Sequence, residues 1–296
     1  LHDILETVLE VQDEWTKQAI ESWDKLKLND YDTLDSKRIC FSKRDERRVE
    51  FGVEFDSFFL WNTCIRFALS KLNIMESSIS EGLEMYTHVA VNAEYLDGIL
   101  DVLKPLAMRT RFDETVFAGI SPRLINSASE FIASGSVFEV SLCDKTRTPF
   151  QPWLDFVRQV KPTKVEIFRI GGEREAEDFL IPLADLVEII YISDATTDNP
   201  VEPPRVPFAV MKQILSRKCS ELIIEYTELP LEEAEKFVQF LHHLSKGCFL
   251  QMQAISEDFE VLNVQVGEYV IKSISTQFHG LVMVIAHQNK EIPDLM

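Results

Sequence analysis

The sequence predicts an α/β chain in which short strands alternate with helices. Apolar, β-branched runs begin near residues 137, 164, 186, 222, 249 and 281, so the expected strands start 22 to 36 residues apart. Between these runs lie segments with helical periodicity, such as TPFQPWLDFVRQV at 148–160. One strand and one helix per 20–36 residues matches the repeat size of leucine-rich solenoids. We therefore expect a degenerate leucine-rich-repeat-like solenoid of strand–helix units, with a mainly helical N-terminal region.

The N-terminal region is expected to span residues 1–83. Apolar residues recur every three to five positions over 3–27, which favours one or two amphipathic helices. Residues 38–55 alternate at period two and predict a hairpin that turns near Lys43–Glu46. The apolar run 58–72 predicts a helix.

The repeat domain is expected to span residues 84–296. It opens with a strand at 84–91 and a helix at 93–106 that ends at Pro105. Ser121-Pro122 provides an N-cap and first-turn pair for the next helix. The acidic, proline-rich segment 193–207 is expected to be a loop, and residues 268–286 a weaker last strand–helix copy. The expected strands are 137–142, 165–170, 186–192, 222–226, 249–255 and 281–286.

Composition limits the classes of partner. The formal net charge of −19 repels phosphate backbones and anionic bilayers, so nucleic acid is an unfavourable partner and a basic or apolar protein surface a favourable one. No apolar run approaches the roughly 20 residues that span a bilayer. The five cysteines are widely spaced, which favours a reducing compartment. We expect a cytoplasmic or nuclear protein that does not bind membranes.

Residues with catalytic chemistry are present but do not form a recognisable motif. Glu232, Glu233 and Glu235 follow Leu-Pro-Leu, where carboxylates stabilise a helix N-terminus without any catalytic role. The adjacent His242 and His243 point to different helix faces and cannot chelate a metal together. No serine-hydrolase or zinc-ligand spacing occurs. We therefore expect a protein that is not an enzyme and needs no cofactor or metal.

Stacking the expected strands predicts a shared face. Aligned as FEV, VEI and VEI, the first three strands place Glu139, Glu166 and Glu188 in one row of carboxylates. Like charges opposite one another destabilise a sheet, which makes such a row more typical of a binding surface than of a structural face. A solvated, purely structural face is the alternative. The residues predicted to bind a partner are Glu139, Ser141, Glu166, Phe168, Glu188, Ile190, Glu225, Gln251 and Gln253.

One basic cluster lies on the expected hairpin. Its members are Lys37, Arg38, Lys43, Arg44, Arg47 and Arg48, interrupted by two acidic residues. A solvated turn explains this cluster, and a docking site for an acidic partner is the alternative interpretation.

Three phrases of the repeated region resemble a known family. SPRLINSASEFIASGSVFEVSL, PFAVMKQILSRKCSELIIEYTELPLEEAEKFVQFL and FHGLVMVIAHQ are similar to FTH-type F-box-associated domains of the nematode F-box family. The resemblance covers roughly residues 85–290 and implies a strand–helix array that captures substrates for a ubiquitin ligase. Residues 1–75 contain no Leu-Pro pair with which an F-box begins, so adaptor recruitment does not follow from the resemblance.

We accordingly expect a non-enzymatic protein–protein interaction module that binds a partner on its strand face, as a ubiquitin-ligase substrate receptor or a scaffold. The alternative is an enzyme on a doubly wound sheet, with a ligand site at the strand ends near Gly171-Gly172, Ser193-Asp194 and Thr227-Glu228. A second alternative is an RNA-associated adaptor that uses the basic hairpin at 37–48.

Overall fold

The computed structural model divides the chain into two compact units, residues 1–138 and 139–296, which we describe separately. It describes residues 34–43, 48–55, 65–66, 68–69, 71–74, 78–81, 86–108, 110–118, 122–143, 150–168, 176–193, 206–225, 239–241, 243, 247–254, 263–276 and 280–290. The expected boundary at 83/84 falls inside the first unit, because strands from both sides of it pair with one another. The predicted helix at 3–27 lies outside the described residues.

The first unit contains a mixed sheet in the order β5-β1-β2-β4-β3. Its strands are β1 (Leu34–Lys43), β2 (Arg48–Phe55), β3 (Ser78–Glu81), β4 (Tyr86–Asn92) and β5 (Thr110–Ala118). β1 pairs antiparallel with β2 and parallel with β5, which confirms the predicted hairpin strands. The turn residues 44–47 lie outside the described part. Of the helix expected at 58–72, the described residues 65–66, 68–69 and 71 are helical.

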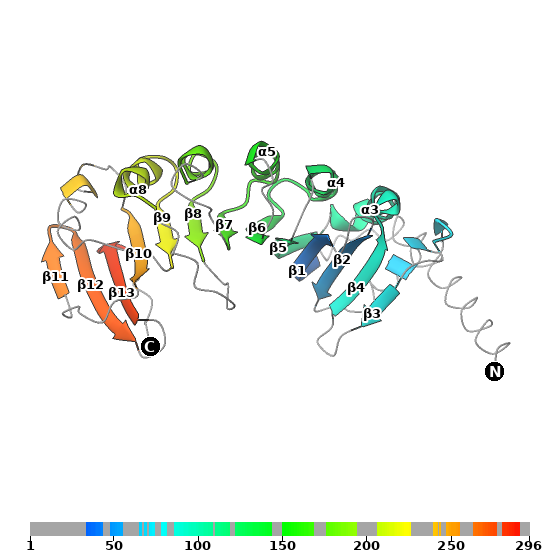
Figure 1. Cartoon of the computed structure of the whole chain (residues 1–296), viewed down its shortest axis with the longest axis horizontal. Helices are drawn as coiled ribbons and strands as arrows, with labels where there is room; N and C mark the ends of the chain where they lie inside the picture. The colour runs from blue at the N-terminus through cyan, green and yellow to red at the C-terminus, as the bar shows by residue number, and fades with distance from the viewer. Residues whose placement is uncertain are drawn as a thin grey trace. The chain divides into compact units, whose positions relative to one another are not determined.

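Two helices cover one face of this sheet (Figure 1). Helix α3 (Ala93–Ala107) begins at Asn92, whose side chain accepts a hydrogen bond from the Glu94 backbone N–H at 3.3 Å. Pro105 lies inside α3 instead of ending it, and the helix continues for two residues to Ala107. Helix α4 (Pro122–Phe131) follows β5 and brings Phe131 edge-on to Phe51 of β2. Stacked and tilted contacts of Phe41 with Phe117 and Phe51 complete this aromatic core.

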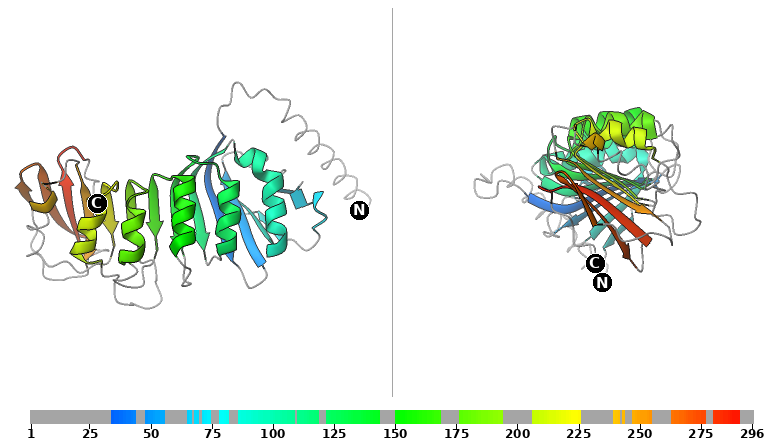
Figure 2. Two further views of the ribbon diagram at one scale, coloured as in Figure 1. Left: turned by 90° about the horizontal axis from the view of Figure 1, so that it is seen from above. Right: turned by 90° about the vertical axis from the view of Figure 1, so that its left-hand side faces the viewer.

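The second unit contains a run of parallel strands with helices between them. The strands are β6 (Val137–Cys143, with its first residues in the first unit), β7 (Lys164–Ile167), β8 (Ile189–Ile192), β9 (Glu221–Ile224) and β10 (Phe249–Ala254). The connecting helices are α5 (Phe150–Val160), η1 (Ala176–Leu180) continuing into α7 (Ile181–Leu183), and α8 (Phe208–Leu215). These described helices lie on one face of the sheet, and the other face carries none of them (Figures 1 and 2). The chain is therefore a mixed α/β protein with an open sheet.

The C-terminal part of the second unit is antiparallel. β13 (Gly280–His287) pairs antiparallel with β10, β12 (Tyr269–Thr276) with β13, and β11 (Asn263–Val266) with β12. In the expected last copy at 268–286, the strand at 281–286 is confirmed as β13, but the helix before it is wrong. Residues 269–276, where the helix was expected, instead form β12 and pair along their whole length with β13, which begins at Gly280.

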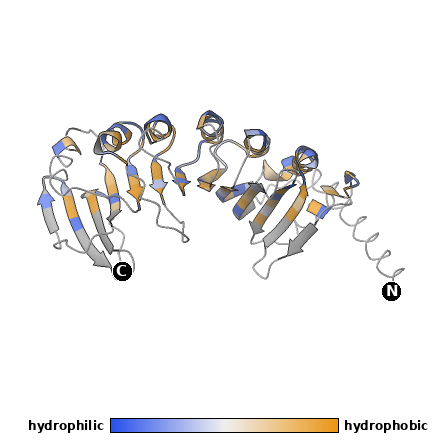
Figure 3. Ribbon diagram, viewed as in Figure 1, coloured by the Kyte–Doolittle hydropathy of each residue, from blue (hydrophilic) through white to orange (hydrophobic). Residues whose placement is uncertain are grey.

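The core of the second unit lies between the helices and the parallel strands. Alternate strand residues point towards the helices and are at most 4 % exposed: Val140, Leu142, Val165, Ile167, Ile190, Ile192, Leu222, Ile224, Leu250 and Met252. β8, β9 and β10 are accordingly hydrophobic along much of their length, whereas the helices are mixed (Figure 3). Their remaining residues point to the face without helices, which we call the open face. Within the described part of the chain, the helices are too short or too polar to cross a bilayer.

Candidate functional site

The open face is organised by a strand register that differs from the expected one. Glu139 pairs with Lys164, and Glu166 pairs with Ser141 on one side and Tyr191 on the other. The predicted row of Glu139, Glu166 and Glu188 is therefore wrong. A cation, instead of a second carboxylate, lies opposite Glu139. This removes the like-charge repulsion that the expected alignment implied.

Two residues of the predicted row belong elsewhere. Glu188 is exposed and precedes β8, where its backbone N–H donates to the Thr163 carbonyl at 3.0 Å. Ile190 is fully buried and packs on the helix side, opposite Val165 and Leu222, so it is not a surface residue. Its neighbour Tyr191 occupies the open face instead, because adjacent strand residues point in opposite directions.

The other predicted residues have mixed environments. Ser141 lies in the same row as Glu166 but is fully buried. Phe168 and Gln251 are partly exposed, and Gln251 pairs with Ile223. Gln253 is in β10, but its side chain lies outside the described set. Of the predicted group, Glu139, Glu166 and Glu225 are brought together with residues that were not predicted.

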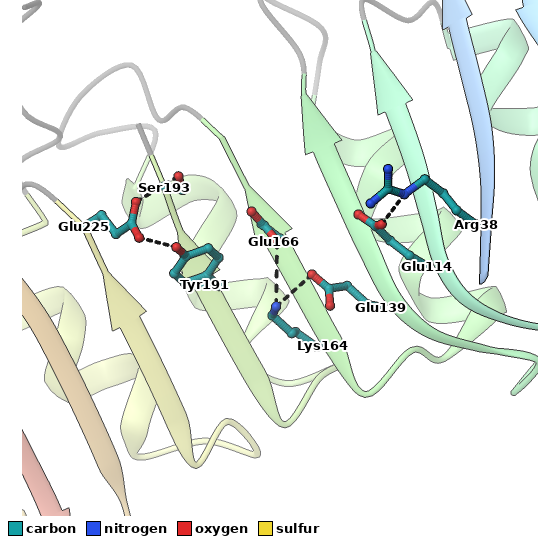
Figure 4. Close-up of polar contacts among 8 residues, drawn as sticks. All are labelled: Arg38, Glu114, Glu139, Lys164, Glu166, Tyr191, Ser193 and Glu225. Carbon is teal, nitrogen blue, oxygen red and sulfur yellow. Dashed lines mark hydrogen bonds and ion pairs between the residues drawn. The ribbon is translucent and has the colours of Figure 1, made fainter. Parts of the chain in front are cut away.

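Lys164 is the centre of a polar network on the open face (Figure 4). Its Nζ lies 2.8 Å from Glu139 Oε1 and 3.7 Å from Glu166 Oε2. The same ammonium is 5.1 Å from the centroid of the Tyr191 ring, within the range of a cation–π contact. The side chains of Lys164, Glu139 and Glu166 are 22 %, 17 % and 15 % exposed, so these ion pairs are partly shielded from water.

Glu225 lies at the end of β9 and receives two hydroxyl hydrogen bonds from the neighbouring strand. The Tyr191 hydroxyl donates to Oε1, and the Ser193 hydroxyl donates to Oε2 at 3.0 Å (Figure 4). Burial raises the pKa of Tyr191, and the hydrogen bond to Glu225 and the negative charges of Glu225 and Glu166 raise it further. The phenol therefore stays protonated at neutral pH and acts as a donor.

An apolar area adjoins this network. Phe249, Val284 and Ala286 form a buried cluster against which the partly buried Ile223 packs. Beside it, Lys290 Nζ lies 2.6 Å from Glu221 Oε1. The open face thus carries charged side chains over β6 and β7 and at both ends of β9, and the apolar cluster lies beside them on β10 and β13.

The basic hairpin is in the first unit and is only partly described. The Nε of Arg38 lies 2.6 Å from Oε2 of Glu114 on the parallel neighbour β5 (Figure 4). Arg48 is exposed at the start of β2. The side chains of Lys37, Lys43, Arg44 and Arg47 lie outside the described set.

Some residues of the alternative sites can also be placed. Ser193 is buried and bonded to Glu225, whereas Gly171-Gly172, Asp194 and Thr227-Glu228 lie outside the described residues, as do Glu232, Glu233 and Glu235. The described residues contain no group of three histidine, cysteine or acidic side chains that could hold a metal ion.

Two residues of the network, Lys164 and Tyr191, were not among the predicted site residues, and Ser193 was named only for the alternative strand-end site. The sequence places each of these residues on the face opposite the core, because each is adjacent to a core residue of its strand. The contacts that they make depend on the strand register, which differs from the expected alignment. Comparison with known families and curated proteins adds nothing to this geometry, since no family model matches the sequence and no curated protein matches it.

Proposed function

We propose that the chain is a protein–protein interaction module whose partner binds on the open face of the second unit. A leucine-rich-repeat-like arrangement of strand–helix units forms the scaffold, and the partner lies across β6–β10. Binding needs no bond-making chemistry from the chain. The module acts as a substrate receptor or as a scaffold. The receptor role is the one that the resemblance to F-box-associated domains implies.

The observation that carries this proposal is a fixed polar network on a sheet face that carries none of the described helices. Lys164, Glu139, Glu166, Tyr191 and Glu225 hold one another in defined positions. Preorganised side chains lose little conformational entropy on association, which favours specific binding. The adjoining Ile223 supplies the apolar contact that polar networks by themselves lack.

The position of the helices supports this function over the enzyme alternative. A doubly wound sheet has helices on both faces and binds ligands at a crevice where the strand order reverses. Here the described helices of the second unit lie on one face, and β6 to β10 follow one another in chain order without a reversal.

Affinity capture from an extract of the source organism tests the proposal. The open-face variant replaces Ile223 and Glu225 by Lys, and the helix-side control replaces the exposed Glu177 and Gln213 by Lys, which changes the net charge equally. We expect a protein that is captured by the wild type and the control but lost from the open-face variant. Capture of the same proteins by all three folded chains would refute the proposal.

A further inference from the structure

The glutamates of the open face differ in how their charge is balanced. Lys164 forms ion pairs with Glu139 and Glu166, and Lys290 forms an ion pair with Glu221. Glu225 instead accepts hydrogen bonds from two neutral hydroxyls, and among the described residues no lysine or arginine forms an ion pair with it. A carboxylate has about four lone-pair positions, so these two bonds orient the group and leave acceptor capacity for a further donor.

The surroundings of Glu225 are complementary to a long cationic side chain. Ile223 lies two residues earlier on the same strand and face, is partly exposed, and pairs with Tyr191 and Gln251. An aliphatic side chain next to an oriented carboxylate suits an arginine, whose methylenes pack on apolar surface while its guanidinium binds the carboxylate. The phenol of Tyr191 borders the same position from β8.

We propose that the partner presents an arginine to Glu225, with the arginine stem lying along Ile223. This inference rests on the proposed function and names the chemistry of the partner. Charge complementarity favours a basic segment of another protein. The open-face residues Glu139, Lys164, Glu166, Glu221 and Glu225, together with Lys290, carry four negative and two positive charges, a sum of −2. A second copy of the chain, at −19, is electrostatically unfavourable.

Fluorescence anisotropy with a dye-labelled peptide tests the inference on the full chain. The probe is a peptide of about nine residues that alternates valine and arginine, and its control carries citrulline, a neutral analogue of the same shape, at each arginine. We expect the arginine peptide to bind roughly tenfold more tightly than the citrulline peptide, as a charge-assisted hydrogen bond requires. Glu225→Gln should weaken arginine-peptide binding about tenfold.

Glu188→Gln is the matched control, because it removes the same charge from an exposed residue that directly precedes β8. Its binding should stay within about twofold of the wild type, since a charge exposed to water contributes little. Should Glu225→Gln fail to fold, Glu225→Asp keeps the charge but withdraws it from both hydroxyls, and about threefold weaker binding is expected. Three results would overturn the inference. They are equal weakening of arginine-peptide binding by the Glu188 and Glu225 variants, equal affinity of the wild type for the arginine and citrulline peptides, and no binding of the arginine peptide at millimolar protein.

The two proposals fail in different ways. If the Ile223/Glu225 variant loses its captured partner but the arginine peptide does not distinguish Glu225, the open face binds by other chemistry and only this inference is wrong. If capture is unchanged by that variant, the proposed function itself is wrong.

Discussion

Replacement of Lys164 by Gln tests whether the polar network is held together by this one cation. The Lys164 ammonium lies 2.8 Å from Glu139 and 3.7 Å from Glu166. At an effective dielectric constant near 20, the Coulomb attraction is about 6 kcal/mol for the first pair and about 4.5 kcal/mol for the second. Desolvation of three partly buried charges offsets most of it. The variant also leaves Glu139 and Glu166 without their cation. We expect a net loss of about 1–3 kcal/mol in the free energy of unfolding, above the roughly 0–1 kcal/mol of an exposed pair.

Urea unfolding at pH 7, followed by circular dichroism, measures this loss. The matched control is Arg158→Gln, which breaks an exposed pair with Asp155 on α5 in which both side chains are 57 % exposed. That control should lose about 0.5 kcal/mol or less. A Glu139→Gln change should recover part of the Lys164→Gln loss, because it removes a carboxylate that has lost its partner. If Lys164→Gln costs no more than Arg158→Gln, the network does not stabilise the open face and the reasoning fails.

Three further predictions concern single side chains. Thr115→Val should raise the free energy of unfolding by about 1 kcal/mol, because the buried Thr115 hydroxyl has no partner in the described structure; a lower urea midpoint would contradict this. Ile190→Ala should cost about 2–5 kcal/mol and Ile189→Ala clearly less, since only Ile190 is fully buried, and equal losses would show that the register is wrong. The pKa of Tyr191 is raised in the folded chain, which therefore holds the phenolic proton more tightly than the unfolded chain, where the pKa of tyrosine is near 10. The contribution of Tyr191 to the free energy of unfolding should therefore be constant below about pH 10 and fall above it. Tyr191→Phe should reduce this alkaline decline in unfolding measurements from pH 8 to 11, and an unchanged slope would exclude Tyr191 as its source.

The location of most elements could be predicted from local sequence. Apolar runs found β6, β9, β10 and β13 to within a few residues, and the alternation at 38–55 found the hairpin strands. Local sequence failed where pairing decides the structure. The 268–286 segment was expected to hold a helix before its strand, and antiparallel pairing made it two strands, β12 and β13.

The candidate site could be predicted as a face but not as a set of contacts. The alternation of core and open-face residues identified the strand face and some of its glutamates. The contacts themselves depend on register, and a shift of two residues replaced a glutamate by Lys164 opposite Glu139. No local feature of Lys164 or Ser193 indicates that it lies beside a carboxylate from another strand.

The segment Leu186–Ile192, LVEIIYI, shows what the local sequence decides and what only the tertiary structure decides. By itself it determines a short β-branched strand, but Val187-Glu188-Ile189 and Ile190-Tyr191-Ile192 both have the form of a core–surface–core triplet. The tertiary structure decided between them. Val187 packs in the preceding turn, where the chain leaves α7, while Ile190 and Ile192 pair with the core residues of β7 and β9. Burial of both isoleucines against the helices fixes the register, and with it places Tyr191, not Glu188, on the open face beside Glu225.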